Sequence, residues 1–454
     1  MTLADHVRQT ALLAWPSIVG QLAVVGMNFV DTALAGRISA RVLAEVAIGS
    51  AIWGIVLLCI LGTVMALSPT VATLRGADGR LEIASVLNQG IYLALVAAVL
   101  GLLALQGAPW LMRTLAVDAE LTPGATRFLI GVQWGAPALA MHLTLLKFCE
   151  GMGRTRPSLY FGVSGLLLLA PIGYVLMNGK LGFPRLESYG CGLATAIVTW
   201  INLLGVASYV WLSFRDIGAL RCWALPDWPR LRQLATLGVP IAFTILMEAG
   251  LFYVVLLLIS RFGQQWAAAH AVAINVASLA FMIPLGLANA VTIRVGFLSG
   301  QNLPEQARFA GFSGYLLCLV TQASSATLII LLAGTLARLY LPQDPEVAEL
   351  ATALLVLAAV FQFPDGIQVI SGGALRGLQD TRWPMLFSII AYWGLGFPLA
   401  YFLAFHTRLG APGLWYGFIL GLSAACVMLT WRFLRISKPA KPDVRSLSVS
   451  GADK

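Results

Sequence analysis

The stretch LATLGVPIAFTILMEAGLFYVVLLLIS, residues 234–260, contains a single charged side chain, that of Glu248. A helix needs about 20 consecutive apolar residues to cross a bilayer, so this stretch is long enough to span one. An ionised carboxylate at the bilayer centre costs roughly 2.5–3.5 kcal/mol on insertion scales, and such residues usually face a cavity. Glu248 is therefore expected to have a functional role inside a membrane helix.

The rest of the chain has the same apolar character. Hydrophobic residues make up 59% of its 454 residues and charged residues only 11%. The ten-residue strands of alternating polarity that are typical of a membrane β-barrel are not found. The sequence predicts an all-α polytopic membrane protein with twelve transmembrane helices, at residues 11–36, 43–70, 86–112, 125–148, 158–178, 190–213, 234–260, 268–298, 309–338, 349–375, 384–405 and 412–434.

The basic residues indicate how the chain is oriented. If both termini are cytoplasmic, 20 of the 29 Lys and Arg residues fall in inner connections and tails, as the positive-inside rule requires. This asymmetry explains the net charge of +9 without a nucleic-acid partner. The six cysteines have no metal-type spacing and are interpreted as packing residues. We expect a multi-pass protein of the bacterial inner membrane, monomeric in the lipid bilayer.

The two halves of the chain are weakly repeated. Val46-Ala47-Ile48 recurs as Val272-Ala273-Ile274, and the loop at 150–157 is similar to that at 375–384. Six spans per repeat give the halves the same orientation, with a binding site expected between them. The predicted organisation is an N-terminal six-helix lobe (1–213), a cytoplasmic linker (214–233), a C-terminal six-helix lobe (234–435) and a disordered basic tail (436–454).

Two further acids lie inside apolar segments, and all three acids have neighbours suited to binding a cation. At helical spacing, Glu248 shares a face with Thr244 and Phe252, and Asp365 with Phe361 and Gln368. Asp31 could share a face with Asn28. A carboxylate beside an aromatic ring suits a lipophilic cation, through charge pairing and cation–π contact.

Several observations limit these interpretations. No Lys or Arg lies within one helical turn of Glu248 or Asp365, so a neutralising partner must come from another helix, an ion or a proton. The alternative is that the acids are held structurally by hydrogen bonds. The aromatic residues Trp134, Phe281, Tyr392 and Trp393 could line a cavity, but are expected by default to face lipid.

Three segments resemble the multidrug and toxic compound extrusion (MATE) transporters of the NorM-type branch. They are NFVDTALAG at 28–36, the helix around Glu248, and QFPDGIQVISGGALRGLQD at 362–380. The similarity extends from about residue 10 to residue 435. It implies two six-helix lobes in a V shape, and export of cationic, often aromatic, compounds driven by inward sodium or protons.

In the C-terminal lobe, the resemblance implies a cation site formed by Glu248 and Asp365. The family often has a tyrosine four residues before the second of these acids. Phe361 occupies that position here and has no hydroxyl group. A sodium ion bound by Glu248 and Asp365 nevertheless remains possible.

In the N-terminal lobe, the first-span Asp of the family matches Asp31, and its sixth-span Thr matches Thr195. Two further ligands are expected near Leu169 and Gly173, neither of which has a ligating side chain. A hard cation needs several oxygen ligands, whereas a proton needs one carboxylate. The missing ligands at Leu169, Gly173 and Phe361 modestly favour proton coupling over sodium coupling.

The predicted function is a secondary antiporter that exports organic cations in exchange for inward protons or sodium, with no cofactor. An alternative is a flippase for a lipid-linked saccharide on a related fold, which would favour a cavity rich in basic residues. An intramembrane enzyme is the other alternative, but we find no phosphate loop, HExxH or GxSxG motif.

Overall fold

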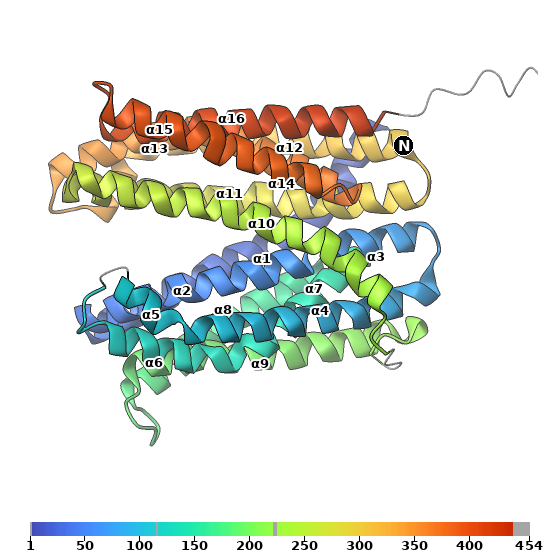
Figure 1. Ribbon diagram of the computed structural model, residues 1–454, viewed down its shortest axis with the longest axis horizontal. Coiled ribbons are helices and arrows are strands. Elements are labelled where there is room, and N and C mark those ends of the chain that lie inside the picture. Colours follow the sequence, from blue (N-terminus) through green and yellow to red (C-terminus); the bar gives the residue numbers. More distant parts are fainter. Residues whose placement is uncertain (1, 115–116, 221–224, 439–454) are drawn as a thin grey trace, which may run out of the picture.

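The computed structural model describes residues 2–114, 117–220 and 225–438 (Figure 1). Cys222, residues 221–224 of the predicted linker and residues 439–454 of the predicted tail lie outside these ranges. The described residues form helices and no strands: α1 (Leu3–Ile38), α2 (Ala40–Val64), α3 (Leu67–Gly76), α4 (Arg80–Gln106), α5 (Ala108–Thr114), α6 (Thr122–Val132), η1 (Gln133–Gly135), α7 (Ala136–Gly151), α8 (Arg156–Asn178), α9 (Glu187–Ser213), η2 (Arg215–Ile217), α10 (Trp228–Ile259), η3 (Ser260–Phe262), α11 (Gln264–Gly300), α12 (Pro304–Tyr340), α13 (Pro345–Gly377), α14 (Arg382–Ser388), η4 (Ile389–Gly396), α15 (Phe397–Phe405) and α16 (Ala411–Ile436).

The prediction of twelve spans is confirmed within the described residues. Twelve helices or continuous helix runs are long and apolar enough to cross a membrane. Four of the runs are composite: α2 continues into α3, α6 through η1 into α7, α10 into η3, and α14 through η4 into α15. Several helix ends have recognisable causes. Thr2 and Asp5 form a capping box at the start of α1. Gly179 ends α8 in the left-handed conformation that favours glycine.

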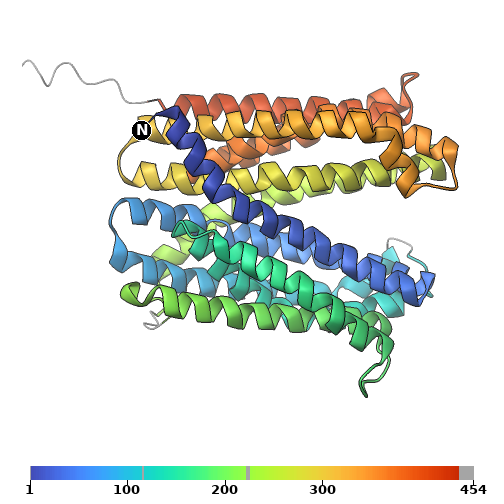
Figure 2. The ribbon, with the colours of Figure 1, turned by 180° about the vertical axis from the view of Figure 1, so that it is seen from behind.

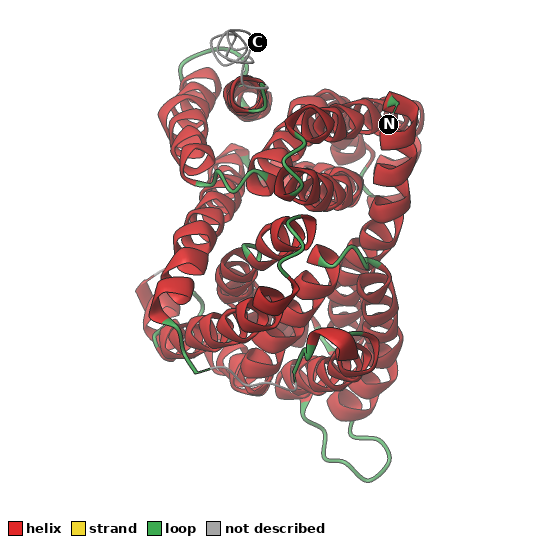
Figure 3. Ribbon diagram, turned by 90° about the vertical axis from the view of Figure 1, so that its right-hand side faces the viewer, coloured by secondary structure: helices red, strands yellow, loops and turns green. Residues whose placement is uncertain are grey.

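The helices form two lobes arranged as a V, as predicted. The later helices, α11 to α16, lie on one side, and α2 to α9 lie on the other (Figures 1 and 2). Figure 3 views the helices from the end at which α1 begins and α16 ends. The start of α1 and the end of α16 lie at the same end of the molecule, which we call the terminus end. This placement is what an even number of spans requires. The lobes approach each other at the terminus end and diverge towards the opposite end (Figure 2).

Helices α1 and α10 pass from one lobe to the other (Figures 1 and 2). The first turns of α1 contact α11 and α12, where Thr10 Oγ1 lies 2.7 Å from Ser313 Oγ. Beyond Gly20, which packs against Ser158 of α8, α1 belongs to the N-terminal lobe. Helix α10 does the reverse, beginning against α2 and α4 and ending in the C-terminal lobe. Each lobe is therefore completed by the first half of the other lobe's first helix.

Close contacts at four glycines accompany the crossing of α1 and α10, and these contacts are related in pairs by the internal repeat. A Cβ atom on Gly62 would collide with Ala242, and one on Gly286 would collide with Ile18. The same holds for Gly76 with Phe297 O and Gly300 with Thr73 O. Both residues of each first contact recur in the second after a shift of 224 positions, close to the shift of 226 that relates Val46 to Val272 in the sequence. We call these four glycines and their partners the glycine seam; it brings the two lobes into contact at the terminus end.

Candidate cation-binding site in the C-terminal lobe

The structure brings Glu248 and Asp365 together through one amide. Gln368 Nε2 donates to Glu248 Oε1 at 3.1 Å and to Asp365 Oδ1 at 3.3 Å. Glu248 comes from α10, and the other two residues lie one turn apart on α13. Asp365 and Gln368 are buried, and Glu248 is half-buried. Two carboxylates 117 positions apart in the chain thus share one site.

This acid pair differs from the other buried acids of the described chain. Glu45 pairs with Arg41 at 2.9 Å and also accepts a hydrogen bond from Ser188. Glu150 pairs with Lys147 at 2.8 Å. Glu248 and Asp365 have no ion pair among the described residues. A buried charge without a partner is costly, so the acid pair needs a cation or a proton that the other two acids do not need.

Aromatic rings cover one side of the acid pair. Phe252 follows Glu248 by one turn on α10, and Phe361 precedes Asp365 by one turn on α13. Because these two helices run in opposite directions, both rings lie on the same side of the acids, 6.0 Å apart between centroids. Trp415 and Phe418 of α16 extend the cluster, at 5.8 Å from Phe361 and 5.0 Å from Phe252 respectively. The predicted combination of carboxylates and rings is therefore present.

Tyr392 and Trp393 could line a cavity by sequence, with lipid as the default, and that default was wrong for Tyr392, which is buried, whereas Trp393 is half-buried. Tyr392 is fully buried, and its hydroxyl donates to Gln368 Oε1 at 3.2 Å. Trp393 Nε1 donates to the carbonyl oxygen of Met247, the residue before Glu248, at 3.1 Å. Tyr392 thus places a hydroxyl near the acids, although Phe361 does not.

The wide turn of η4 places these two neighbours against different helices. Residues Ile389–Gly396 form a π-helix, an arrangement often found at functional sites. Tyr392 contacts α13 while Trp393 contacts α10. The sequence does contain a signal for this part of the site, because two aromatic residues with polar tips, Tyr392 and Trp393, precede Gly394 and Gly396. Tyr and Trp are also enriched at membrane interfaces, so the signal alone does not place them at the site.

Thr244 is placed differently from the acids. Its hydroxyl donates to the carbonyl oxygen of Pro240 in the same helix at 2.9 Å. The side chain is half-buried. Its predicted role in lining the cavity stays a prediction.

The N-terminal lobe offers far fewer ligands around Asp31. Thr195 Oγ1 lies 3.4 Å from Asp31 Oδ2, and Asp31 Oδ1 is buried without a hydrogen-bond partner. Asn28, which was predicted to share this face, is exposed. Leu169 is fully buried in an apolar cluster, and a Cβ atom on Gly173 would lie 2.9 Å from Leu34. Hydrocarbon therefore occupies the positions where further ligands were expected.

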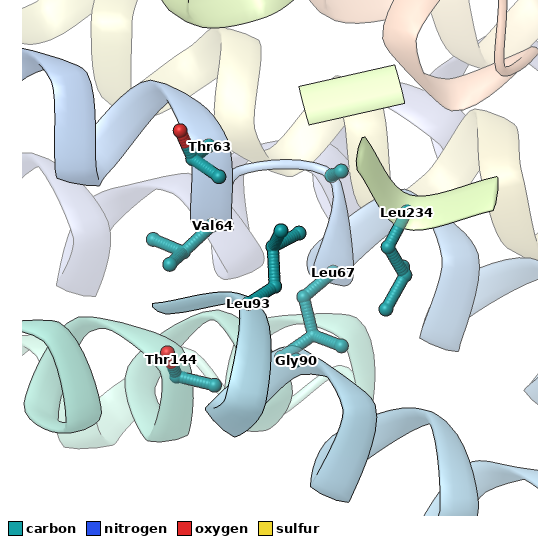
Figure 4. A pocket seen from close by; sticks show the side chains of 8 residues that line it. Thr63, Val64, Leu67, Gly90, Leu93, Thr144 and Leu234 are labelled. Atoms are coloured by element: carbon teal, nitrogen blue, oxygen red, sulfur yellow. The ribbon is translucent and has the colours of Figure 1, made fainter. Parts of the chain in front are cut away.

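A small pocket in the N-terminal lobe is not a substrate site. It lies between α2, α3, α4, α7 and α10, and its volume is about 10 Å³ (Figure 4). That volume suits about one water molecule. Its lining is mainly apolar, with Thr63 and Thr144 as its hydroxyl groups.

A comparison with known families supports the interpretation. The MatE family model matches residues 16–175 and 240–402. The chain belongs to the MatE family. The two matched segments fall in the two halves of this MatE chain, and the resemblance found in its sequence is confirmed.

Curated relatives cover nearly the whole MatE chain. A "Probable multidrug resistance protein NorM" from Xanthomonas campestris is 42% identical over 437 residues, which is 96% of this chain and 95% of the relative. The "Multidrug resistance protein MdtK" of Yersinia pestis is 39% identical, covering 95% and 96% of the two chains.

Solved MATE structures share the fold. The eukaryotic MATE transporter AtDTX14 matches with a TM-score of 0.88 at 19% identity, over 98% of each chain. A structure described as an outward-facing conformation of a multidrug resistance MATE family transporter matches with a TM-score of 0.86, also at 19% identity, over 95% of this chain and 96% of that one. The MatE chain is thus a multi-pass membrane protein with the MATE fold.

Proposed function

We propose that this MatE transporter is a secondary antiporter of the bacterial inner membrane that exports organic cations in exchange for an inward cation. The names of its NorM and MdtK relatives support multidrug efflux as the task. The observation that carries the proposal is the acid pair: two carboxylates, bridged by Gln368, without an ion pair in the described chain.

The chemistry of the site suits competition between two cations. A coupling ion or proton on Glu248 and Asp365 cancels one of their two negative charges. A lipophilic substrate cation can do the same while its rings stack on Phe252 and Phe361. Because the coupling ion and the substrate cation need the same two carboxylates, binding of one displaces the other. Asp31 would tune opening of the N-terminal lobe in a similar way.

The coupling ion that we favour is the proton. Gln368 turns its NH₂ group, a donor, towards both acids, while its oxygen accepts from Tyr392. A sodium ion between the acids would lack that amide oxygen as a ligand, whereas a proton needs a single carboxylate. Bound sodium at Glu248 and Asp365 is the competing form of the same proposal.

The driving force depends on the net charge that one exchange cycle moves. One positive charge moving inward across 100 mV contributes roughly 2.3 kcal/mol. That energy supports a gradient of about fifty-fold, because each 1.36 kcal/mol is a factor of ten, but only when a cycle brings in one more positive charge than it exports; a one-for-one exchange of monocations is driven by the concentration gradient of the coupling ion. We further propose that both termini are cytoplasmic, that the transporter is monomeric in the bilayer, and that it needs no cofactor. The count of basic residues supports this orientation.

The test is ethidium efflux from proteoliposomes, with sodium and proton gradients imposed separately. The variant is Glu248→Gln, and the matched control is Glu346→Gln, an exposed acid near the start of α13. We expect proton-driven efflux that Glu248→Gln abolishes and Glu346→Gln preserves. Efflux driven by a sodium gradient alone would show that the coupling ion is sodium and not a proton. Coupled efflux that survives Glu248→Gln would refute the mechanism, and no efflux under either gradient would favour lipid-linked cargo.

A further inference from the structure

A half-buried arginine lies below the acid pair without an ion pair in the described chain. Arg376 lies near the end of α13, and its Nε and Nη2 atoms are shielded from solvent without a hydrogen-bond partner among the described residues. Two other arginines at this end are engaged: Arg294 donates to His6 and Thr10 of α1, and Arg432 pairs with Asp380 at 2.8 Å. Arg75 and Arg308 also each have one shielded nitrogen without a partner, but their guanidinium groups lie over the rings of Phe297 and Phe312.

The Arg376 side chain extends along α13 towards the acids. It follows Asp365 by eleven residues, which is close to three full turns, so both lie on one face of the helix. Helical side chains point back towards the N-terminus, which for Arg376 is the direction of Gln368 and Asp365. Gly372 leaves the path open: Arg376 Nη1 lies 3.6 Å from the position that a Cβ atom on Gly372 would take. The guanidinium therefore lies one turn of α13 nearer to Gln368 and Asp365 than its own Cα atom does.

The site therefore has a layered order along the membrane normal. The rings of Phe252 and Phe361 lie towards the open end of the V. The two carboxylates come next, then Gln368 with Tyr392, and then Arg376 nearest the terminus end. A cation that enters from the open end would meet the aromatic layer first and would have a fixed positive charge beneath it.

We propose that Arg376 is a specificity-determining residue, whose fixed positive charge leaves the C-terminal site with one net negative charge and makes it select singly charged cations. This inference rests on the proposed function and names its substrate class more closely. Two ionised acids and one guanidinium sum to minus one. The other ionisable groups close to them, Tyr392 of η4 and Cys318 of α12, are neutral when protonated. A monocation neutralises the site, whereas a dication leaves a buried excess charge.

The test compares two dyes that differ in charge. Ethidium and propidium share the phenanthridinium ring, but propidium carries a second quaternary ammonium group. Equilibrium dialysis would measure the binding of each dye to the full-length transporter in nanodiscs. The readout is the ratio of the two dissociation constants, which cancels effects on the shared ring. We expect the wild type to prefer ethidium, and Arg376→Gln to shift the ratio towards propidium by roughly ten-fold, the effect of one charge about 10 Å away at an effective dielectric constant near 20.

Two controls separate charge from structure. Arg376→Lys keeps the charge and should keep the wild-type ratio. Arg382→Gln removes the same charge from an exposed position on α14 and should also leave the ratio unchanged. If Arg376→Gln does not accumulate, Arg376→Met preserves more of the side-chain bulk and serves the same purpose. An unchanged ratio in a folded Arg376→Gln or Arg376→Met variant would overturn the proposal.

The same assay distinguishes this proposal from the one on which it rests. If Glu248→Gln abolishes binding of both dyes but Arg376→Gln leaves their ratio unchanged, the acid pair binds substrate and Arg376 has no role in selectivity. If Glu248→Gln leaves the binding of both dyes intact, substrates do not bind at the acid pair, and both proposals fail.

Discussion

At the scale of single residues, the partner of each buried acid separates structure from function. Glu45 and Glu150 have cations of their own at 2.9 and 2.8 Å. Removing one member of a buried pair such as Lys147 and Glu150 typically costs 3–5 kcal/mol. Glu248 and Asp365 have an amide between them instead. The spacing along the chain already separates the two kinds, because Arg41 and Lys147 lie within one helical turn of Glu45 and Glu150, and no Lys or Arg lies so close to Glu248 or Asp365.

Tyr392→Phe should weaken coupled transport without preventing it. The substitution removes one hydrogen bond to Gln368 and leaves the ring in place, and such a bond is worth about 1 kcal/mol. We expect proton-driven ethidium efflux to fall by roughly five-fold, measured as the initial rate in proteoliposomes. Tyr401→Phe on α15 is the matched control, because that side chain is partly exposed and contacts neighbouring rings. Equal rates for wild type and Tyr392→Phe would show that the hydroxyl does not support the site.

At the scale of elements, one side chain makes most of the polar contacts between the first turns of α1 and the opposite lobe. Arg294 of α11 donates to the His6 carbonyl at 2.5 Å, to Thr10 Oγ1 at 2.6 Å and to Gln9 Oε1 at 3.0 Å, and it contacts His6 Nδ1 at 2.7 Å. The structure makes it the main polar link between α1 and the C-terminal lobe, beside the contact of Thr10 with Ser313.

Arg294→Met should loosen the first turns of α1. Removing the guanidinium leaves the side chains of His6, Gln9 and Thr10 without this donor, so local opening becomes easier. We expect faster amide hydrogen exchange in residues 3–15, measured by mass spectrometry, with little change in the rest of α1. Arg261→Met, at an exposed position at the opposite end of the molecule, should not change exchange there. Unchanged exchange in Arg294→Met would mean that apolar packing and the remaining contacts, such as Thr10 with Ser313, are enough to hold α1.

At the scale of the whole molecule, the glycine seam lets two lobes of similar shape approach closely at one end. Its contacts are related by the 224-residue repeat, so each glycine has a counterpart that performs the same task in the other half. In the antiport cycle proposed above, the lobes open and close alternately at their two ends. The seam is then the surface that would separate when the terminus end opens.

Gly300→Val should prevent close approach of the lobes. Its side chain would meet the carbonyl oxygen of Thr73, which cannot move aside as a flexible side chain could. We expect ethidium efflux to fall at least ten-fold while the protein still folds and inserts. Gly334→Val on α12 is the control, because nothing lies within 4 Å of a Cβ atom there. Efflux at the wild-type rate from Gly300→Val would show that tight closure at Thr73 is not required.

Much of the architecture could be predicted from sequence, because the signals are local. Runs of apolar residues located the twelve spans, and an even number of spans places the two termini at the same end of the molecule. Helical spacing placed Gln368 and Phe361 beside Asp365, and Phe252 beside Glu248. These results depend on residues within one or two turns of each other on one helix.

Only the tertiary structure decided which helices meet. It joined Glu248 to Asp365, brought Tyr392 inwards through a π-helix, and sent α1 and α10 across to the opposite lobes. It also showed that Arg376, three turns from Asp365, extends towards the acids while Arg294 is engaged elsewhere. Hydropathy could not reveal these contacts, because in a membrane every apolar helix face is equally acceptable to lipid. The choice of partner is made by shape, by small residues such as Gly62 and Gly286, and by polar groups that must find each other.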